Sequence, residues 1–287
     1  MKIYQKKPEW LRVRIDNTAE FKEITDLVAV KGLNTVCKDA RCPNISDCWS
    51  RRTATFMILG NVCTRNCTFC AVKTGKPAPV DTEEPKRVAE AVKKLNLKYA
   101  VITSVNRDEL PDGGAAIFAD TISEIRKILP SCKVEVLIPD FKGDHQALDI
   151  VLAAKPDVLN HNVETIERLY KTIRPQARYH QSLQVLSHAK EQGFTTKTGF
   201  MVGLGETTEE IKEILQHIKD HRVDIVTIGQ YLQPSRGHAP VVKYYTPDEF
   251  REFKSFGENI IGIHHIESGP LIRSSYHADE VAEKLDA

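Results

Sequence analysis

Six of the seven cysteines lie between Cys37 and Cys70, in two groups of three. The second group, Cys63-Thr-Arg-Asn-Cys67-Thr-Phe-Cys70, has the spacing C-x3-C-x2-C. Three thiolates this close in sequence can hold three corners of a four-iron, four-sulfur cube. A tetrahedral zinc ion or a fully ligated cluster needs a fourth protein ligand nearby, and residues 71–74 supply none. The spacing therefore predicts a cluster with one open iron, which catalysis needs and an electron carrier lacks.

The first group, Cys37, Cys42 and Cys48, has the spacing C-x4-C-x5-C. Three more soft ligands predict a second cluster. Buried structural cysteines are the alternative for this group, although its charged neighbours do not resemble a core. A zinc knuckle with a distant fourth ligand is the alternative for the second group, whose sequence lacks the usual second close pair. Cys132 stands alone, and we expect it to be a small buried hydrophobic residue.

Downstream of Arg52, short apolar runs rich in Val and Ile alternate with longer amphipathic stretches. Such runs are typical of strands that are covered on both faces of a parallel sheet. We expect six strands, at 55–59, 100–104, 133–138, 158–162, 197–202 and 225–230. We expect helices between them, at 85–95, 113–129, 144–154, 164–171, 179–192 and 207–220. Pro85 suits a first helical turn, and Thr207 or Thr208 is the expected cap of the last helix.

Six successive strand–helix units predict an α/β fold with a parallel sheet. The Gly-rich turn of a dinucleotide-binding fold is missing, because the stretch 203–206 is too short for that fingerprint. We therefore expect an open partial TIM barrel of about six βα units, with closure by eight units as the alternative. The expected organisation is an N-terminal extension (1–52) with the first cysteine group, the barrel (53–230), and a C-terminal segment (231–287) that crosses back.

Polar side chains gather at the carboxyl ends of four expected strands. In barrels of this kind the active site is built on that face. Exposed loops are polar in any protein, so one such set would prove little, but four together favour a site. The sets are Thr103, Ser104, Asn106 and Arg107; Asn160, His161, Asn162 and Glu164; Gly203 to Glu206; and Gln230 with Tyr231.

The charge balance of 40 basic and 39 acidic residues gives a net charge of +1. That value argues against bulk electrostatic attraction to nucleic acid or to an anionic membrane. No apolar run reaches the length of a membrane span, and the basic stretch 1–15 lacks the hydrophobic core of a signal peptide. Clustered thiols agree with a reducing compartment, so we expect a soluble protein of the cytoplasm.

The C-x3-C-x2-C spacing, with the aromatic Phe69 before its last cysteine, resembles that of radical S-adenosylmethionine enzymes. The resemblance implies that the open iron binds the amino and carboxylate groups of S-adenosylmethionine. Reduction of the cluster then cleaves the sulfonium and yields a 5′-deoxyadenosyl radical.

Over nearly its whole length the chain resembles the lipoyl synthase family more specifically. The resemblance rests on both cysteine groups and on seven further stretches: Leu33–Cys37, Arg52–Met57, Cys70–Gly75, Asn160–Thr165, Met201–Glu206, Gln230–Pro234 and Ser268–His277. The C-x4-C-x5-C spacing together with Arg-Ser-Ser-Tyr at 273–276 is far more specific than C-x3-C-x2-C alone.

Several assignments follow from this resemblance. The family inserts two sulfur atoms at C6 and C8 of an octanoyl chain that is amide-linked to a lysine of a carrier domain. Two [4Fe–4S] clusters and S-adenosylmethionine are the implied cofactors, with the auxiliary cluster as sulfur donor. The radical-generating cluster would be held by Cys63, Cys67 and Cys70. The auxiliary cluster would be held by Cys37, Cys42, Cys48 and a serine of the Arg-Ser-Ser-Tyr motif. We expect that serine to be Ser275, with Ser274 as the less favoured choice.

The strand-end residues then become the expected pocket for S-adenosylmethionine and substrate. We expect Asn162, Glu164, Glu206 and Gln230 to contact the cofactor, and Arg273 to steer charge or substrate. In the loop after the second strand, Asp108, Asp112, Gly113 and Gly114 are expected either to face the pocket or to form a surface turn.

The implied protein partners are octanoylated carrier domains, namely 2-oxoacid dehydrogenase E2 subunits and the glycine cleavage H protein. Flavodoxin or ferredoxin is the implied reductant. Other readings remain open at this stage. They are a biotin synthase-like or methylthiotransferase-like enzyme, an iron–sulfur electron carrier, and a zinc-dependent nucleic-acid binder, which the near-neutral charge disfavours.

Overall fold

The computed structural model describes residues 6–13, 18–39, 42–51, 53–276 and 278. Arg52 and His277, which belong to two of the stretches quoted above, lie outside these described residues. The main sheet has eight strands in the order β1-β2-β5-β6-β7-β8-β9-β10. Their bounds are β1 Asn34–Thr35, β2 Thr55–Ile58, β5 Tyr99–Ser104, β6 Lys133–Leu137, β7 Val158–Asn160, β8 Thr196–Val202, β9 Ile225–Gln230 and β10 His265–Gly269. Only β1 is antiparallel to its neighbour, so β2 and the six strands after it form a parallel array.

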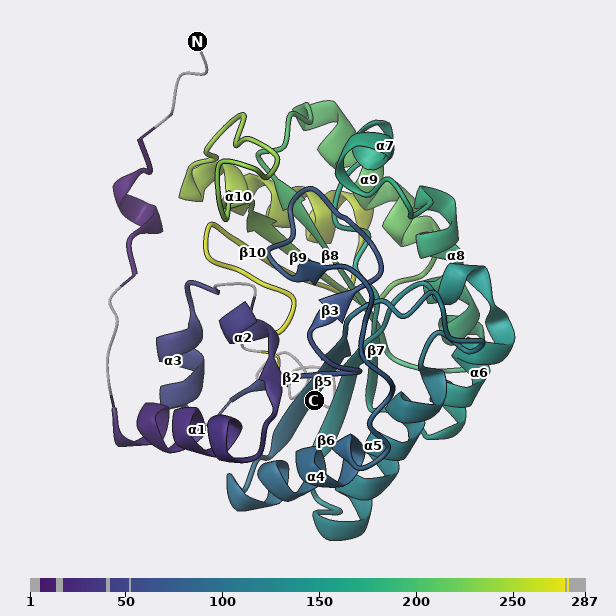
Figure 1. Ribbon diagram of the computed structural model, residues 1–287. Helices are drawn as coiled ribbons and strands as arrows, with labels where there is room; N and C mark the ends of the chain where they lie inside the picture. The colour runs from purple at the N-terminus through teal and green to yellow at the C-terminus, as the bar shows by residue number, and fades with distance from the viewer. Residues whose placement is uncertain (1–5, 14–17, 40–41, 52, 277, 279–287) are drawn as a thin grey trace.

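Helices cover the outer face of this curved sheet (Figure 1). The helices that follow successive strands are α4 Glu84–Lys94, α5 Ala115–Ile128, α6 His145–Ala153, α8 Tyr179–Glu191, α9 Thr208–Asp220 and α10 Pro247–Ser255. A smaller group, α1 Ala19–Val30, α2 Val36–Asp39 and α3 Ile45–Ser50, lies beside the barrel in Figure 1. The short segments are the 3-10 turns Glu9–Leu11, Phe141–Gly143 and Glu167–Leu169, helix α7 Tyr170–Ile173, and a π-helical turn Phe256–Ile261.

The expected open partial barrel is confirmed, because the sheet order does not close β10 onto β1 in the described residues. All six expected strands form, and β10 adds a further parallel strand to β9. The expected boundary at residue 230 therefore falls between two neighbouring strands of one sheet. Thr207 caps α9 through a capping box, as one of the two expected caps.

The expected helix at 164–171 is wrong in its first turn. Glu164 has a φ of 65° and forms a β-bridge with Phe200, so helical structure starts only at Glu167. A left-handed non-glycine residue is rare and interrupts a helix. The polar residue thus continues the edge of β7 instead of beginning a helix.

Side chains of the parallel strands alternate between the helices and the barrel interior, as the pleat requires. Four polar side chains meet inside the barrel and are almost fully buried. Glu135 accepts hydrogen bonds from the Tyr99 hydroxyl (2.7 Å), Asn160 Nδ2 (2.8 Å) and Lys197 Nζ (3.1 Å). We call Tyr99, Glu135, Asn160 and Lys197 the floor network.

In the residues described above, none of the helices combines the length and the apolar character that crossing a bilayer requires.

Candidate metal centre

A cavity of about 650 Å³ lies at the carboxyl ends of the parallel strands. Its wall includes cysteines of both groups, namely Cys37, Cys42, Cys63, Cys67 and Cys70. All seven thiols of the chain are free. Cys48 is absent from the wall, yet it lies close enough to Cys37 and Cys42 for their charges to raise its pKa in addition to burial. The fold thus brings two cysteine groups that are separate in sequence to one central cavity.

The loop that carries the second cysteine group is framed by two short strands, β3 Val62–Cys63 and β4 Lys73–Thr74. Within it, Cys63 Sγ accepts hydrogen bonds from the backbone N–H groups of Arg65 and Asn106, each at 3.4 Å. Backbone donors of this kind stabilise a thiolate and orient it. The Cys63 sulfur is therefore oriented by its own loop and by the loop that follows β5.

Arg65, between two of the cysteines, anchors this loop from below. Its guanidinium pairs with Asp108 (2.7 Å) and Asp140 (2.6 Å), and its side chain is only 2% exposed. Burial opposes ionisation of Asp140, but the hydrogen bonds and charge of Arg65 outweigh it and lower the pKa of Asp140 to about 2. The role of Arg65 could not be predicted from the sequence, because nothing in a C-x3-C motif marks an arginine as buried.

A strained residue precedes the loop. Leu59 has a φ of 67°. Its N–H donates to the buried carboxylate of Glu84 (2.6 Å), and its carbonyl accepts from Arg107 Nη1 (3.0 Å). A Cβ on Gly114 would lie 2.3 Å from Leu59 Cδ1, so only glycine fits beside it. Arg107, expected near the pocket, thus acts on the backbone that enters the cysteine loop.

The first cysteine group is tied to the C-terminal segment. The Thr55 hydroxyl donates to Ser275 Oγ at 2.9 Å, and Thr55 also hydrogen-bonds Cys37. Asn44 Nδ2 donates to the carbonyl of Leu271 at 2.7 Å. Burial is the largest cause that raises the pKa of the Cys37 thiol, to about 11. A thiol whose pKa is raised in this way stays protonated near neutral pH and releases its proton when a metal binds, because the ligand is the thiolate.

The two serines of the C-terminal motif point in different directions. Ser275 contacts Thr55, whereas the Ser274 hydroxyl donates to Asn162 Oδ1 at 2.9 Å. Arg273 also lines the cavity, where burial lowers its pKa and the nearby Cys42 raises it. Burial lowers the pKa of Lys7, and the nearby charge of Arg273 lowers it further.

The four residues expected to contact S-adenosylmethionine divide into two kinds. Asn162 and Glu164 lie together on the cavity wall, where Asn162 Nδ2 donates to Glu164 Oε1 at 3.1 Å. Burial raises the pKa of Glu164. Gln230 also borders the cavity, but its amide binds the backbone of Val202, Tyr231, Lys243 and Tyr245.

Glu206 is the expected contact that the structure does not bring to the cavity wall. Its two carboxylate oxygens accept the N–H groups of Gly203 (2.5 Å) and Leu204 (2.9 Å). Both oxygens are therefore used in ordering the turn after β8. Glu206 is a local capping residue in this arrangement.

Most of the expected residues after β5 also have structural partners. Asp108 pairs with Arg65, and Asp112 accepts the N–H groups of Gly114 and Ala116 at the start of α5. Gly113 is packed against Phe141, since a Cβ there would lie 2.9 Å from Phe141 Cδ1. Cys132 is 1% exposed, which confirms the expectation that it is a core residue.

Arg174 is a site residue that sequence reasoning missed. Its Nη1 donates to the carbonyl of Asn162 (3.0 Å) and to the Tyr170 hydroxyl (2.9 Å), while its buried Nε has no hydrogen-bond partner. Arg174 lines the cavity near Cys67, and its charge lowers the pKa of that thiol against the larger effect of burial. No local motif marks this arginine, which follows the short helix α7.

Several other buried polar atoms on the cavity wall lack partners. They are Ser104 Oγ, Asn106 Oδ1 and His161 Nε2. His161 Nδ1 lies 2.9 Å from the carbonyl of Ile138, so this nitrogen carries the proton and Nε2 is an acceptor. Buried polar atoms ordinarily find partners. The wall therefore fits a polar ligand that supplies both donors and acceptors.

The thiols do not converge on a point. Among the residues that the structure describes, no group of three Cys, His, Asp or Glu side chains could hold one metal ion. Their chemistry and the size of the cavity instead suit clusters that are ligated at separate irons.

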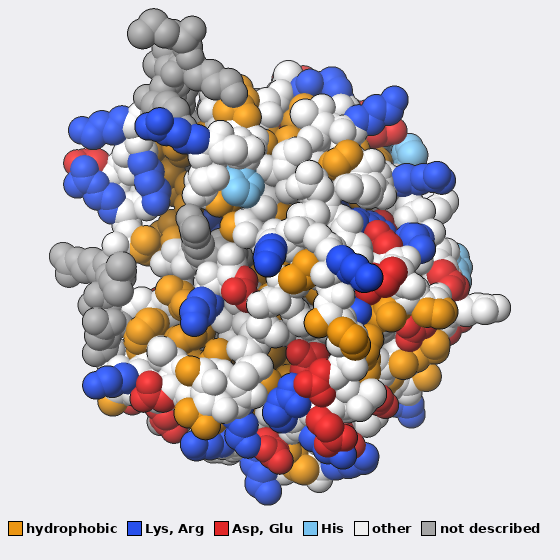
Figure 2. Space-filling view, in the orientation of Figure 1, with side chains coloured by type: hydrophobic (Ala, Val, Ile, Leu, Met, Phe, Trp, Pro, Cys, Tyr) orange, Lys and Arg blue, Asp and Glu red, His pale blue; other side chains and the backbone are white. Residues whose placement is uncertain are grey.

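The outer surface shows less organisation than the cavity. Charged side chains of both signs are scattered over the face seen in Figure 2.

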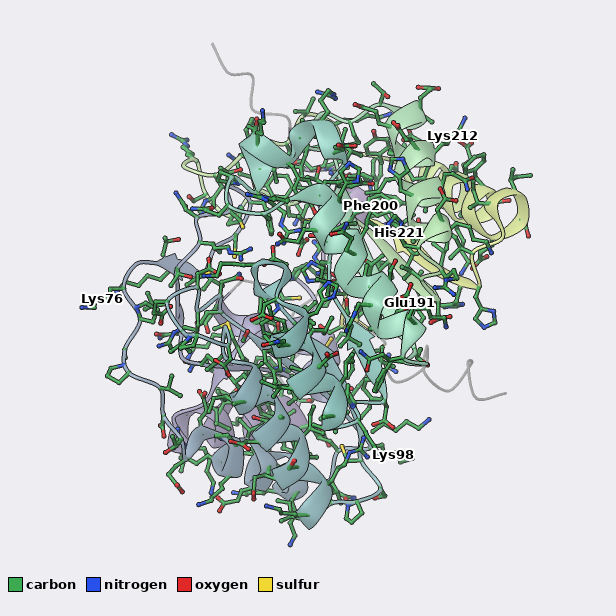
Figure 3. The ribbon with its side chains drawn as sticks, turned by 90° about the vertical axis from the view of Figure 1, so that its right-hand side faces the viewer. Lys76, Lys98, Glu191, Phe200, Lys212 and His221 are labelled. Atoms are coloured by element: carbon green, nitrogen blue, oxygen red, sulfur yellow. The ribbon has the colours of Figure 1, made fainter. Side chains whose placement is uncertain are left out.

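The two ends of the barrel are seen when the molecule is turned by 90°. Lys76, which follows the second cysteine group, projects from the side opposite Lys98 and Glu191 (Figure 3). The cysteine loop and the amino ends of the strands thus lie at opposite sides of the barrel.

Comparison with known proteins gives the class. Residues 57–218, more than half of the chain, match the family model of the Radical SAM superfamily. The fold is similar to that of methylornithine synthase (PylB), with a TM-score of 0.57 at 14% identity over 92% of each chain. It is also similar to Streptococcus suis SuiB bound to S-adenosylmethionine, with a TM-score of 0.59 at 12% identity over 88% of this chain and 62% of that one. Fold and cysteine motif together define a radical SAM protein.

Two curated relatives are more specific. A lipoyl synthase of Rubrobacter xylanophilus is 58% identical over 279 residues, which are 96% of this chain and 87% of that one. A lipoyl synthase of Caldicellulosiruptor saccharolyticus is 55% identical over 97% of this chain and 98% of that one. The chain belongs to the lipoyl synthase family. It is accordingly a radical SAM sulfurtransferase that uses S-adenosylmethionine and [4Fe–4S] clusters.

Proposed function

We propose that this chain inserts two sulfur atoms at C6 and C8 of an octanoyl chain carried on a lysine of a protein domain. The observation that carries the proposal is the shared cavity, whose lining includes cysteines of both groups and Ser275. A substrate chain in that cavity can reach both groups without leaving the protein. An electron carrier would have no use for such a space.

The two cysteine groups have separate parts in this proposal. Cys63, Cys67 and Cys70 hold the radical-generating cluster and leave one iron for S-adenosylmethionine. Cys37, Cys42 and Cys48 hold the auxiliary cluster, with Ser275 as its distant fourth ligand. The bond from Thr55 to Ser275 and the contact of Thr55 with Cys37 support Ser275 over Ser274.

The side chains around Cys67 form the proposed binding site for S-adenosylmethionine. Asn162 and Glu164 supply paired donor and acceptor atoms at the wall. The free Nε of Arg174 supplies a charged donor for a carboxylate. Gln230 holds the neighbouring backbone in place, and Glu206 does the same for the turn after β8. Neither of these two is assigned a direct contact.

When bound, the clusters and S-adenosylmethionine supply radical abstraction of hydrogen from unactivated carbon, together with the sulfur that replaces it. The protein's own part is placement and exclusion of water. Arg65 and Glu84 hold the cysteine loop rigid, and the wall residues Phe69, Met201 and Tyr231 enclose the cavity. Rigid placement of this kind matters because a reactive species in an open site would attack solvent or protein.

The proposed protein substrates are the octanoylated domains of 2-oxoacid dehydrogenase E2 subunits and the glycine cleavage H protein. Flavodoxin or ferredoxin is the proposed electron donor. A reducing compartment such as the cytoplasm suits seven free thiols.

An anaerobic reconstitution tests the proposal. Iron and sulfide are counted after reconstitution, and dithionite, S-adenosylmethionine and an octanoyl-lysine peptide are then added. We expect 5′-deoxyadenosine and a peptide that has gained two sulfur atoms. Formation of 5′-deoxyadenosine without a thiolated peptide would refute sulfur insertion, and no 5′-deoxyadenosine at all would refute the assigned radical site.

A further inference from the structure

Two adjacent serines connect the two halves of the central cavity. Ser275 accepts a hydrogen bond from Thr55, which contacts Cys37 of the first cysteine group. Ser274 donates to Asn162 Oδ1 at 2.9 Å, and Asn162 donates in turn to Glu164. One peptide bond therefore separates a contact on the auxiliary side from a contact on the S-adenosylmethionine side.

The contact of Ser274 with Asn162 is built into the barrel wall. It lies directly over Gly199 of β8, where a Cβ would come within 3.1 Å of Ser274 Oγ and 3.0 Å of Asn162 Oδ1. The next strand makes similar room, because a Cβ on Gly229 would lie 2.2 Å from the carbonyl oxygen of Ile272. Two glycines on neighbouring strands thus admit the C-terminal segment into the barrel.

Ser274 decides which end of the Asn162 amide faces Glu164. A hydroxyl that donates to Oδ1 leaves Nδ2 directed at the Glu164 carboxylate, 3.1 Å away. Without this donor the amide can rotate, and its oxygen could then face the carboxylate oxygens unfavourably. The backbone of Asn162 is already fixed by Arg174, so only the side-chain end depends on Ser274.

We propose that Ser274 is a positioning residue that couples the auxiliary site to the binding of S-adenosylmethionine. The coupling rests on the proposed function, which assigns Ser275 to the auxiliary cluster and Asn162 with Glu164 to S-adenosylmethionine. Ligation of Ser275 immobilises the segment, Ser274 then holds Asn162, and the cofactor binds a preformed pair. Loss of the auxiliary cluster releases the segment and weakens binding at the other site, as thermodynamic linkage requires of any coupled pair.

Binding measurements test the coupling without turnover. S-adenosylmethionine is titrated anaerobically into reconstituted protein whose clusters are kept oxidised, so that no cleavage occurs. We expect Ser274→Ala to bind about fivefold to tenfold more weakly than the unaltered chain, the worth of one buried hydrogen bond. Ser131→Ala, an exposed serine before β6, is the matched control and should bind normally.

A second comparison isolates the auxiliary site. Cys42→Ala, which removes one proposed ligand of the auxiliary cluster, should weaken binding of S-adenosylmethionine in a chain that keeps Ser274 but have little further effect in Ser274→Ala. Amide hydrogen exchange of the reconstituted chain, measured without S-adenosylmethionine, adds a readout independent of activity. We expect residues 161–165 to exchange faster in Ser274→Ala than in the control.

The outcomes separate the two proposals. If the unaltered reconstituted chain binds no S-adenosylmethionine, the proposed function itself fails. If it binds normally and Ser274→Ala binds equally well, only the coupling is overturned. Should Ser274→Ala not fold, the Cys42→Ala comparison decides alone, because unchanged affinity there overturns the coupling.

Discussion

The hydroxyl of Thr55 lies 2.9 Å from that of Ser275, a residue 220 positions later in the chain. Thr55 is the first residue of β2 and also contacts Cys37, so it joins the first cysteine group to the C-terminal motif. Ser275, and not its neighbour, is therefore the serine of this motif that lies beside the first cysteine group.

Ser275→Ala should impair sulfur insertion far more than cleavage of S-adenosylmethionine. Removing a proposed cluster ligand should lower insertion about tenfold or more, whereas the cysteine loop at 63–70 is untouched. Thiolated peptide and 5′-deoxyadenosine are measured by mass spectrometry in the same reaction, with Ser131→Ala as control. Equal retention of both products would show that the assignment of Ser275 is wrong.

Asp140→Asn should loosen the loop that carries the second cysteine group. It removes one of the two buried carboxylates that pair with Arg65, and we expect the free energy of unfolding to fall by about 2–3 kcal/mol. The control is Asp81→Asn, which breaks an exposed pair with Arg87 and should cost less than about 1 kcal/mol. Urea unfolding of the cluster-free chain provides the comparison. A similar loss in both variants would contradict the anchoring role.

His161 should make stability depend on pH between about 4 and 6.5. Burial is the largest cause that lowers its pKa from 6.5 to about 4, followed by the charge of Arg174, with Asp140 opposing and Arg65 adding to it. The unfolded chain therefore binds one more proton than the native chain in this range. The stabilisation is complete above pH 6.5 and is lost as the pH falls towards 4, by about 3 kcal/mol.

His161→Gln removes the titrating group and provides the check. The free energy of unfolding of the cluster-free chain is measured from pH 7 to 4 for both proteins. We expect a shallower fall in the variant. Parallel curves would mean that His161 is not held neutral in the native state.

Lys197→Met should destabilise the chain strongly, because it leaves Glu135 of the floor network buried without its cation. Breaking one side of a buried ion pair typically costs about 3–5 kcal/mol. The double variant Glu135→Leu/Lys197→Met removes both charges and should recover part of that loss. Thermal and urea unfolding compare the three chains, and a double variant less stable than Lys197→Met alone would contradict this account.

Gly199→Ala should weaken binding of S-adenosylmethionine while leaving the fold intact. The added methyl group would lie 2.4 Å from Thr227 Oγ1 and would push Ser274 and Asn162 apart. Gly237→Ala is the control, since a Cβ there meets nothing nearer than 3.8 Å. Titration of the reconstituted proteins should show a loss of about fivefold or more for Gly199→Ala alone. Equal affinities would show that the wall tolerates the displacement.

The barrel could be predicted from sequence because its strands are continuous apolar runs. The run at 225–230 matches β9 in both bounds, since burial on both faces leaves a strong pattern. By contrast, Lys197 and Glu135 are each a single charged residue in an otherwise apolar strand. Their pairing inside the barrel therefore could not be predicted. β10 was missed because His265 and Glu267 make its sequence look polar.

The candidate site was predictable where residues carry a spacing and unpredictable where they do not. The cysteines form motifs, and so do the residues from Asn160 to Thr165. Arg65, Glu84 and Arg174 act through partners far away in sequence, which no local pattern encodes. Glu206 is the opposite case, because this conspicuous motif residue uses both carboxylate oxygens in its own turn.

Ser275 lies far downstream of the cysteines, and this distance sets the order in which the parts of the two sites are synthesised. On a ribosome, Cys37, Cys42 and Cys48 emerge more than 220 residues before Ser275, their proposed partner. The loop at 63–70 and its neighbours Arg65, Asp140 and Arg174 have all been synthesised by position 174. This point is more than a hundred residues before Ser275. A nascent chain therefore holds the loop at 63–70 and its anchoring residues before it holds Ser275, so the proposed radical site is complete before the proposed sulfur-donor site.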